Sequence, residues 1–270
     1  MPGQWLVLLL VGLIAGVASG MFGIGGGVVI VPLLVILGFG LLPAIGTSLG
    51  ALLMPVGIFA VIEYYRAGKV KFGIAAPIAA GLVGGILVGA EIAQSLPQAT
   101  LQQLYGAFML WIGWRFAEPR KLWARWRAGQ PAPRPPEETR VTTSWVWLLL
   151  LGLGAGVLAG MFGIGGGAII VPALVGLLKF DQKLANGTSL AALLLPVGLG
   201  GVITYYREGY LDPASAALVA IGLAVGALGG ARLALGLPSH RVKQFYGFFL
   251  IIIGLRFLLF DLLVQLLGRA

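Results

Sequence analysis

The chain lacks cysteine altogether and contains a single histidine, His240. Without cysteine there is no disulfide framework, no thiol chemistry and no cysteine-ligated metal site. One histidine leaves little basis for a histidine-ligated metal, so we expect neither a metal nor any other cofactor. An enzyme would need clustered acids, bases, nucleophiles or metal ligands, which this sequence hardly offers. It also shows no Walker-type phosphate loop, so we do not expect it to hydrolyse ATP.

Charge is scarce too. Only 10% of the 270 residues are charged and 59% are hydrophobic, whereas a soluble domain typically carries about 25% charged residues. The mean hydropathy is +1.00, and the apolar runs do not show the period-2 alternation of a membrane β-barrel. The sequence therefore predicts an all-α integral membrane protein that lies in a lipid bilayer.

The formal net charge of +9 is a topological signal. A basic chain can bind nucleic acid, but here the Lys and Arg residues lie in short loops between apolar segments. Positive residues in such loops are what the positive-inside rule expects of a membrane protein. We therefore expect no nucleic-acid partner.

Ten apolar segments follow one another, five on each side of a polar stretch. They are residues 5–19, 28–39, 44–64, 72–93 and 101–117, then 145–159, 168–178, 184–205, 214–235 and 244–260. A helix needs roughly 20 residues to cross a bilayer, so the short opening segments of each half leave about eight to ten spans. The predicted organisation is a first transmembrane repeat over 1–117, a polar linker over 118–144 and a second repeat over 145–270.

The stretch Gly20–Leu34 occurs twice. Its sequence, GMFGIGGGVVIVPLL, returns as GMFGIGGGAIIVPAL at Gly160–Leu174, offset by 140 positions. In a helix interior, Gly costs roughly 1 kcal/mol and Pro roughly 3 kcal/mol relative to Ala, so neither copy favours a continuous helix. Two near-identical helix interruptions inside apolar sequence indicate a paired functional element.

The repeat continues past this motif at an offset of 141. The matches include GTSL at 46–49 and 187–190, PVG at 55–57 and 196–198, and YYR at 64–66 and 205–207. The halves are therefore duplicated units, and an odd number of segments in each would insert them with inverted topology. Most basic residues then fall on one face with the 118–144 linker, which the positive-inside rule places in the cytoplasm. Both termini would be external.

Duplicated halves of inverted topology are a recurrent plan of secondary transporters, which hold substrate near the membrane midplane at interrupted helices. Backbone N–H groups at a helix N-terminus, together with the positive end of the helix dipole, suit an anion. The glycine motifs would supply such termini. The sequence thus predicts a transporter that moves a small anion by alternating access between its two halves.

The paired motifs at 20–32 and 160–172, each followed by Gly-Thr-Ser, resemble the sulfite exporter TauE/SafE-like family of membrane permeases. The resemblance covers both halves, nearly the whole chain apart from the linker and the tail. It implies an exporter of sulfite, sulfoacetate or a related small organosulfur or carboxylate anion in the bacterial inner membrane. It does not choose among these substrates.

The candidate substrate site rests on glycine backbone. Glycine lets amides approach the oxygens of a sulfite or sulfonate without a Cβ in the way; the alternative is close packing or a simple break between spans. The candidates are Gly23, Gly25, Gly26, Gly27, Gly163, Gly165, Gly166 and Gly167. Polar residues that follow could donate to the anion, cap the next helix, or do both: Thr47, Ser48, Asn186, Thr188 and Ser189.

Charged and aromatic residues near the span ends are further candidates. Glu91 aligns with Arg232 across the repeat, and the pair could carry a coupling proton and attract an anion, or simply snorkel to the interface. Two repeated pairs are interfacial anchors or an anion-attracting vestibule: Tyr65-Arg66 and Tyr206-Arg207.

Four stripes of glycines spaced by four residues favour a structural role, because such stripes let helices cross closely in lipid. They are Gly12, Gly16 and Gly20; Gly81, Gly85 and Gly89; Gly152, Gly156 and Gly160; and Gly222, Gly226 and Gly230.

The expected partners are the small anion, the lipid bilayer and, as an option, a second copy in a homodimer. Four alternatives to an exporter stay open: an anion channel built from the same repeat, a permease for small carboxylates or other sulfur oxyanions, the less favoured membrane-embedded enzyme, and, as the weakest rival, a purely structural scaffold. Saturable flux that responds to a proton gradient would separate a transporter from a channel.

Overall fold

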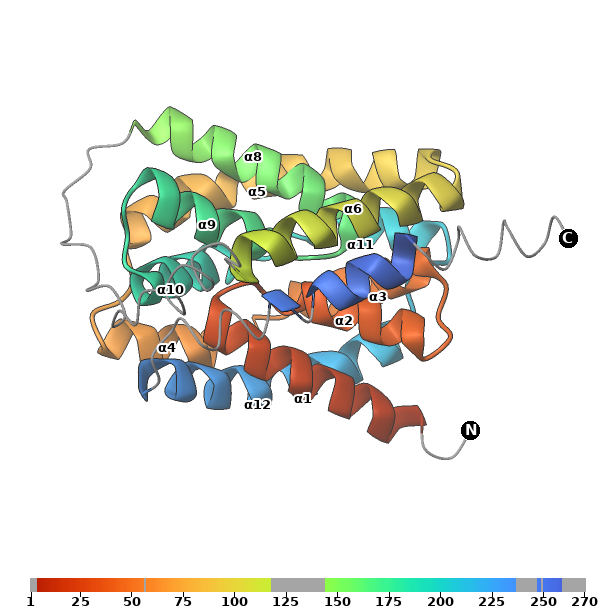
Figure 1. The fold of residues 1–270 in the computed structure, drawn as a ribbon, viewed down its shortest axis with the longest axis horizontal. Coiled ribbons are helices and arrows are strands. Elements are labelled where there is room, and N and C mark those ends of the chain that lie inside the picture. Colours follow the sequence, from red (N-terminus) through yellow and green to blue (C-terminus); the bar gives the residue numbers. More distant parts are fainter. Residues whose placement is uncertain (1–3, 56, 118–143, 237–246, 249, 259–270) are drawn as a thin grey trace, which may run out of the picture. The chain divides into compact units, whose positions relative to one another are not determined.

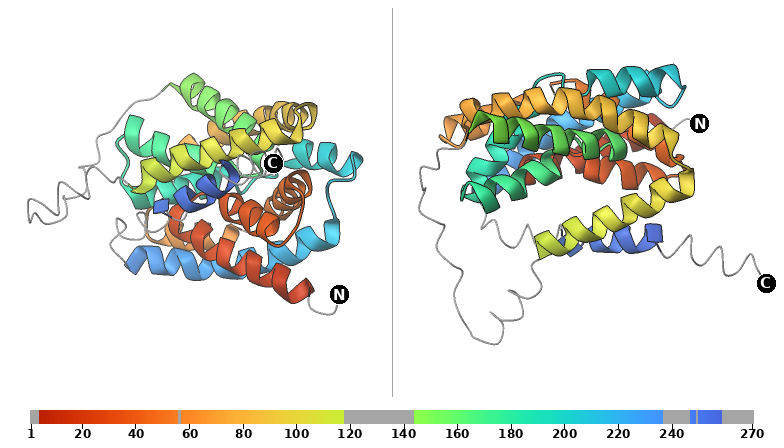
Figure 2. Two further views of the ribbon diagram at one scale, coloured as in Figure 1. Left: turned by 45° about the vertical axis from the view of Figure 1, so that its right-hand side comes forward. Right: turned by 90° about the horizontal axis from the view of Figure 1, so that it is seen from above.

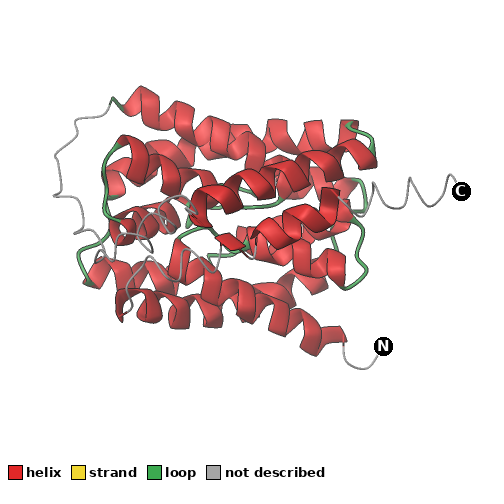
Figure 3. Ribbon diagram, viewed as in Figure 1, coloured by secondary structure: helices red, strands yellow, loops and turns green. Residues whose placement is uncertain are grey.

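The computed structural model describes residues 4–55, 57–117, 144–236, 247–248 and 250–258, and every regular element within them is a helix (Figure 3). The predicted all-α class is confirmed. The chain forms two compact units, one of residues 1–95 with 136–237 and one of residues 96–135 with 238–270. The linker prediction for 118–144 falls outside the described residues except for Ser144, which caps the helix that follows.

Unit 1 contains five helices from each sequence repeat, in matching order. From the first repeat come α1 (Gln4–Phe22), α2 (Gly27–Ile36), α3 (Leu41–Leu53), α4 (Ile58–Arg66) and α5 (Phe72–Ser95). From the second come α8 (Trp145–Phe162), α9 (Gly167–Leu177), α10 (Gln182–Ala192), α11 (Leu199–Arg207) and α12 (Pro213–Gly236).

Unit 2 also draws on both repeats. It contains α6 (Gln98–Ala117) and the helical residues 250–258. Small residues let these two helices approach, since a Cβ built on Gly113 would lie 2.8 Å from the backbone nitrogen of Ile251. The rings of Tyr105 and Phe257 pack with centroids 5.1 Å apart.

Four of the described helices are long and apolar enough to cross a membrane: α1, α5, α8 and α12. The pair α3 and α4, bent by 52° at its break, would make a fifth span. The sequence predicted about eight to ten spans. This count covers the described residues alone, and segment 244–260 lies only partly within them. Four of the other segments form α2, α3, α4, α9, α10 and α11, which are only 9 to 13 residues long.

Unit 1 is held together by two helix pairs that join the repeats, α1 with α12 and α5 with α8 (Figures 1 and 2). A Cβ built on Gly12 would lie less than 3.0 Å from the carbonyl oxygen of Val219, and one on Gly222 less than 3.0 Å from that of Leu9. Real Cβ atoms essentially never come so close. The glycine stripes therefore serve helix packing, as the sequence favoured.

The second helix pair follows the same rule. A Cβ built on Gly85 would lie less than 3.0 Å from the carbonyl oxygen of Leu153, and one on Gly156 would lie 2.8 Å from that of Leu82. Successive contacts along both pairs advance in the same chain direction, so the partners of each pair run parallel.

The helices α5 and α12 run in opposite directions (Figure 1). Lys69, just before α5, forms an ion pair with Asp181 at the start of α10, with Nζ and Oδ2 2.8 Å apart. Lys183 in α10 donates to the carbonyl oxygen of Leu235 at the end of α12, at 2.8 Å. We call this end of unit 1 the lysine end. The opposite end contains the α2–α3 and α11–α12 loops.

Candidate functional site

The two glycine motifs break their helices through left-handed backbone. Gly25 and Gly26 have φ angles of 80° and 82°, and Gly165 and Gly166 have φ angles of 72° and 78°. Side chains with a Cβ rarely adopt this conformation. The backbone therefore requires glycine at all four positions, and it turns into α2 and α9 through the N-caps Gly26 and Gly166.

The two motifs touch each other through their backbones. A Cβ built on Gly167 would lie 2.5 Å from the carbonyl oxygen of Gly23, and one built on Gly27 would lie closer still to the carbonyl oxygen of Gly163. Each contact from the first repeat to the second is matched by an equivalent contact from the second to the first, as in a two-fold self-complementary interface. The structure therefore brings all eight predicted glycines into one place.

Serine hydroxyls tie each motif to the other repeat. Ser48 on α3 donates to the carbonyl oxygen of Gly163 at 2.6 Å, and Ser189 on α10 donates to that of Gly23 at 2.8 Å. All four residues are buried. A buried carbonyl without a partner would be costly, so these bonds hold the breaks in shape.

Two tyrosines, which the sequence did not single out as site residues, donate hydrogen bonds to the first residue of each glycine motif. The hydroxyl of Tyr64 donates to the carbonyl oxygen of Gly20 at 2.8 Å, and that of Tyr205 donates to Gly160 at 3.1 Å. The repeated Tyr-Tyr-Arg sequence could have indicated these tyrosines, but our prediction chose the second tyrosine of each pair. That residue is exposed, whereas the first is buried.

The helix-capping interpretation of the Thr-Ser pairs is wrong. Thr47 and Thr188 lie inside α3 and α10, which begin several residues earlier, at Leu41 and Gln182. Thr188 instead accepts a hydrogen bond from the backbone N–H of Lys71 at 3.1 Å. A direct contact between these hydroxyls and an anion stays a prediction.

Asn186 is a polar residue without a counterpart in the first repeat, where Ile45 takes its place. It is 2% exposed, and its Nδ2 donates to the carbonyl oxygen of Met21 at 2.7 Å. Its Oδ1 accepts from Gln182 at 2.9 Å. It therefore joins the first glycine motif to the start of α10.

A cavity of about 30 Å³ lies between Gly25 and Gly165, and it has room for roughly one water molecule. Leucine side chains line it beside the glycines: Cδ1 of Leu193 lies 2.9 Å from a Cβ built on Gly25, and Cδ1 of Leu52 lies 2.9 Å from one built on Gly165. Most of the lining comes in repeat-related pairs: Leu49 and Leu190, Leu52 and Leu193, and Gly57 and Gly198, joined by Ser19, Ile86 and Val197.

The predicted charged candidates lie away from this cavity. Arg232 pairs with Glu63 on α4, with Nη2 and Oε1 3.0 Å apart, while Glu91 is exposed on α5. The Tyr-Arg pairs end α4 and α11, where Tyr65 and Tyr206 are 61% and 59% exposed; Arg66 and Arg207 occupy the last turns. Roles in coupling or anion attraction stay predictions for all six: Glu91, Arg232, Tyr65, Arg66, Tyr206 and Arg207.

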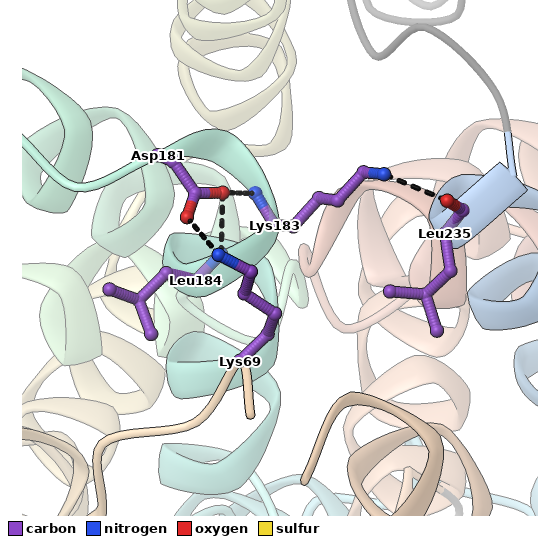
Figure 4. Close-up of polar contacts among 5 residues, drawn as sticks. All are labelled: Lys69, Asp181, Lys183, Leu184 and Leu235. Atoms are coloured by element: carbon purple, nitrogen blue, oxygen red, sulfur yellow. Dashed lines mark hydrogen bonds and ion pairs between the residues drawn. The ribbon is translucent and has the colours of Figure 1, made fainter. Parts of the chain in front are cut away.

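Asp181 organises the polar groups of the lysine end (Figure 4). Its Oδ1 accepts from the backbone N–H groups of Lys183 and Leu184 at 2.8 and 3.1 Å, so it caps α10. Burial alone would raise the pKa of this carboxyl, but the hydrogen bond and charge of Lys69 and the two backbone bonds lower it below 3.8. Asp181 is therefore an anion paired with Lys69.

Among the residues that the structure describes, no group of three His, Cys, Asp or Glu side chains is placed to hold a metal ion. The polar side chains that the structure describes in unit 1 include serine and tyrosine hydroxyls, Asn186, and the ion pairs Lys69–Asp181 and Arg232–Glu63.

The chain matches the family model of the sulfite exporter TauE/SafE over residues 8–257. It is similar to two probable membrane transporter proteins of Bacillus subtilis. One is YunE, 28% identical over 256 residues that cover 89% of this chain and 90% of the relative. The other is YdhB, 27% identical with 88% and 94% covered. A probable membrane transporter protein of Methanocaldococcus jannaschii is 28% identical, with 76% and 74% covered. No solved structure matches.

Proposed function

The chain belongs to the sulfite exporter TauE/SafE family of membrane transporters, and we propose that it is a secondary transporter that exports a small anion, sulfite or an organosulfonate. The observation that carries this proposal is the meeting of the two glycine motifs at the starts of α2 and α9. In this proposal the motifs are two halves of one anion site.

The chemistry of the motifs suits an oxyanion. The first N–H groups of a helix have no partner within it, and they lie at the positive end of the helix dipole. Neither N-cap, Gly26 or Gly166, offers a side chain that bonds to these groups in the described structure. Several motif carbonyls, by contrast, already accept from serine and tyrosine hydroxyls. The groups left to meet a ligand are therefore amides.

Alternating access is the mechanism that we propose for this site. The opposite directions of α5 and α12 and the paired contacts of the motifs support repeats of inverted topology. The breaks between α3 and α4 and between α10 and α11 supply places where helices can bend. Since the cavity holds about one water molecule, loading an anion requires Leu52 and Leu193 to move away from the glycines.

The positive-inside rule gives the proposed orientation. It places the lysine end and residues 118–144 in the cytoplasm of a bacterial cell, and both termini outside the inner membrane. The proposed cargo then loads from the lysine end and leaves at the opposite end.

Sulfite efflux from proteoliposomes tests the function. Flux through the wild-type protein should saturate with sulfite concentration. Gly25→Ala should lower it by roughly tenfold or more, because the added Cβ keeps the anion away from the backbone amides and a hydrogen bond to a charged ligand contributes about 1.5–3 kcal/mol. The matched control is Gly209→Ala. Gly209 shares the left-handed backbone, with φ 74°, but nothing lies within 4 Å of a Cβ built there.

Both variants carry similar backbone strain, but the Cβ of Gly25→Ala also approaches Cδ1 of Leu193, at 2.9 Å. A loss of flux is therefore assigned to the site only where the thermal midpoints of the two variants agree. Purification yield and thermal midpoint establish that each variant is folded. Equal flux through Gly25→Ala and Gly209→Ala would remove the glycine site. Flux that rises linearly without saturation would indicate an anion channel in place of a transporter.

A further inference from the structure

The lysine end carries an excess of positive charge in two segments that lie against each other. Residues 67–71 and 178–183 together contain four lysines and one carboxylate: Lys69, Lys71, Lys179, Lys183 and Asp181. The ion pair between Lys69 and Asp181 is compact, at 2.8 Å, so these two charges neutralise one another. The positive charges of the other three lysines are in excess.

These lysines are arranged by the fold. The ammonium group of Lys71 lies 4.9 Å from the ring centroid of Phe180, in cation–π contact. Lys183 is partly buried, and its ammonium group lies 2.8 Å from the carbonyl oxygen of Leu235. The positive-inside rule asks only for charge in the loop, with no defined position for the head group. Topology alone therefore does not account for this arrangement.

Lys183 has hydrogen-bonding capacity beyond the one bond that the structure shows for it. An ammonium group has three N–H donors, and one of them goes to Leu235. The carbonyl at the end of α12 does not by itself demand a lysine as its hydrogen-bond donor. In the first repeat, Leu42 takes the position of Lys183, and Gln94 at the end of α5 takes that of Leu235. The same fold thus forms there without the cation.

Polar side chains lead from Lys183 toward the glycine motif. Its neighbour Gln182 donates to Asn186 at 2.9 Å, and Asn186 donates to Met21 at 2.7 Å. The backbone of Asn186 lies so close to Gly23 that a Cβ there would be 2.5 Å from its Cα. We call this row of contacting residues the polar path: it runs from the partly exposed Lys183 and Gln182 to the buried Asn186 and ends at the candidate anion site.

The opposite end of unit 1 has the same helices without this chemistry. The residues that replace Lys179, Asp181, Gln182, Lys183, Asn186, Lys69 and Lys71 are Gly38, Gly40, Leu41, Leu42, Ile45, Tyr210 and Asp212. These replacements carry no cation and one carboxylate. The polar path is therefore one-sided.

We propose that the lysine end is a loading vestibule for small oxyanions, in which the ammonium group of Lys183 binds the anion before it passes Asn186. This inference rests on the proposed function and adds a second site and a direction to it. A sulfite or sulfonate in solution and the phosphate of an anionic lipid headgroup, such as phosphatidylglycerol, offer the same oxyanion chemistry, and the experiment separates them.

The test compares Lys183→Leu, which installs the residue of the first repeat, with two matched variants. Lys183→Arg keeps the charge, and Arg115→Leu removes one positive charge from the exposed last turn of α6, in unit 2. Sulfite flux is measured in vesicles of phosphatidylcholine alone and in vesicles that also contain phosphatidylglycerol. We expect Lys183→Leu to raise the KM for sulfite about tenfold in both lipids, as for a lost charge-assisted hydrogen bond. The maximum rate should stay within about twofold, because the glycine site is intact.

The controls give the expected result its meaning. Lys183→Arg should restore the KM, and Arg115→Leu should leave it unchanged. An unchanged KM in Lys183→Leu would overturn the vestibule, as would an equal rise in Arg115→Leu, which would indicate only a general effect of charge. A rise confined to phosphatidylglycerol vesicles would assign Lys183 to a lipid headgroup and overturn the loading role.

Direct binding separates failure of this inference from failure of the proposed function. Sulfate binding to the detergent-solubilised protein is measured by calorimetry without lipid. If the wild-type protein carries no sulfite flux but binds sulfate, and Lys183→Leu weakens that binding, the vestibule stands and the proposed substrate is wrong. Sulfate binding that is equal in both proteins would overturn the vestibule whatever the flux.

Discussion

The lysine end and the opposite end of unit 1 are formed by equivalent helices, yet they differ in chemistry. At the lysine end, Asp181 caps α10 and pairs with Lys69. At the opposite end, Gly40 precedes α3 without a side-chain cap, and Tyr210 occupies the position of Lys69. The centre of the unit is different again, because almost every contact there has its repeat-related counterpart.

This difference separates two kinds of constraint. Symmetric features, such as Ser48 with Ser189 and Tyr64 with Tyr205, shape the two halves of one site. Asymmetric features such as Lys183 and Asn186 distinguish the two ends of the proposed path. Substitutions of symmetric residues should therefore have equal effects in both repeats. Substitutions at the lysine end should have effects that substitutions at the equivalent positions of the opposite end do not reproduce.

Breaking a glycine stripe should have the largest effect on the symmetric part. A Cβ in Gly85→Ala would meet the carbonyl oxygen of Leu153 at less than 3.0 Å, so α5 and α8 must separate. We expect a loss of about 1–3 kcal/mol or more from such overpacking. Its neighbour Gly84 is the control: a Cβ there would lie 3.6 Å from Cδ1 of Leu153, an ordinary contact, and Ala should gain roughly 1 kcal/mol in helix propensity.

Thermal midpoints of the purified variants measure this contrast. The other repeat shows the same contrast on α12, where a Cβ on Gly230 would clash with the carbonyl oxygen of Val17 and one on Gly229 meets nothing within 4 Å. Midpoints that move in the same direction for both members of either pair would show that the stripes do not set the helix spacing.

Removing one serine hydroxyl should have an intermediate effect, equal in the two repeats. Ser48→Ala leaves the buried carbonyl of Gly163 without its donor, and Ser189→Ala does the same to Gly23. Each should cost about 1–3 kcal/mol. Ser95→Ala is the control, because this exposed hydroxyl bonds only within α5, to Ile92 at 2.8 Å. Midpoint losses that differ greatly between Ser48→Ala and Ser189→Ala would break the symmetry of the centre.

The ion pair of the lysine end should have the smallest effect, visible as pH dependence. The pKa of Asp181 is lower in the folded protein than its ordinary value of 3.8. The stability that it contributes is therefore present above about pH 4 and is lost as the pH falls through the folded pKa. The side chains of Lys69 and Asp181 are 31% and 16% exposed, so solvent screening limits the effect to about 1 kcal/mol.

Asp181→Asn is the matched variant for this effect, because Asn also caps a helix but carries no charge. Between pH 6 and pH 3 the thermal midpoint of the wild-type protein should fall further than that of the variant. Parallel pH profiles would mean that the ion pair contributes nothing to the lysine end.

Local pattern was enough to predict the all-α class, the glycine breaks and the packing role of the stripes. Glycine at 25, 26, 165 and 166 marks left-handed backbone, and small residues every four positions mark close helix contacts. Both signals lie within a single segment, so sequence spacing carries them.

Contacts between repeats could not be predicted in this way. The partner of Ser48 is Gly163, 115 positions away, and that of Asn186 is Met21, 165 positions away. Leu52 and Leu193 look like any other apolar residues until the fold places them against the glycines. The ends of the helices within the apolar segments were out of reach for a related reason, because hydropathy does not show where glycine and proline end a helix.

The measurement that tests the central claim most directly is sulfite flux through Gly25→Ala, Gly165→Ala and the double variant, with all three shown to be folded. If the two motifs form one site, each single variant loses most of the flux and the double variant is no worse than either, because coupled residues are not additive. If each single variant kept about half of the flux and only the double variant lost it all, the motifs would be two independent sites, which contradicts a single anion site shared between the repeats.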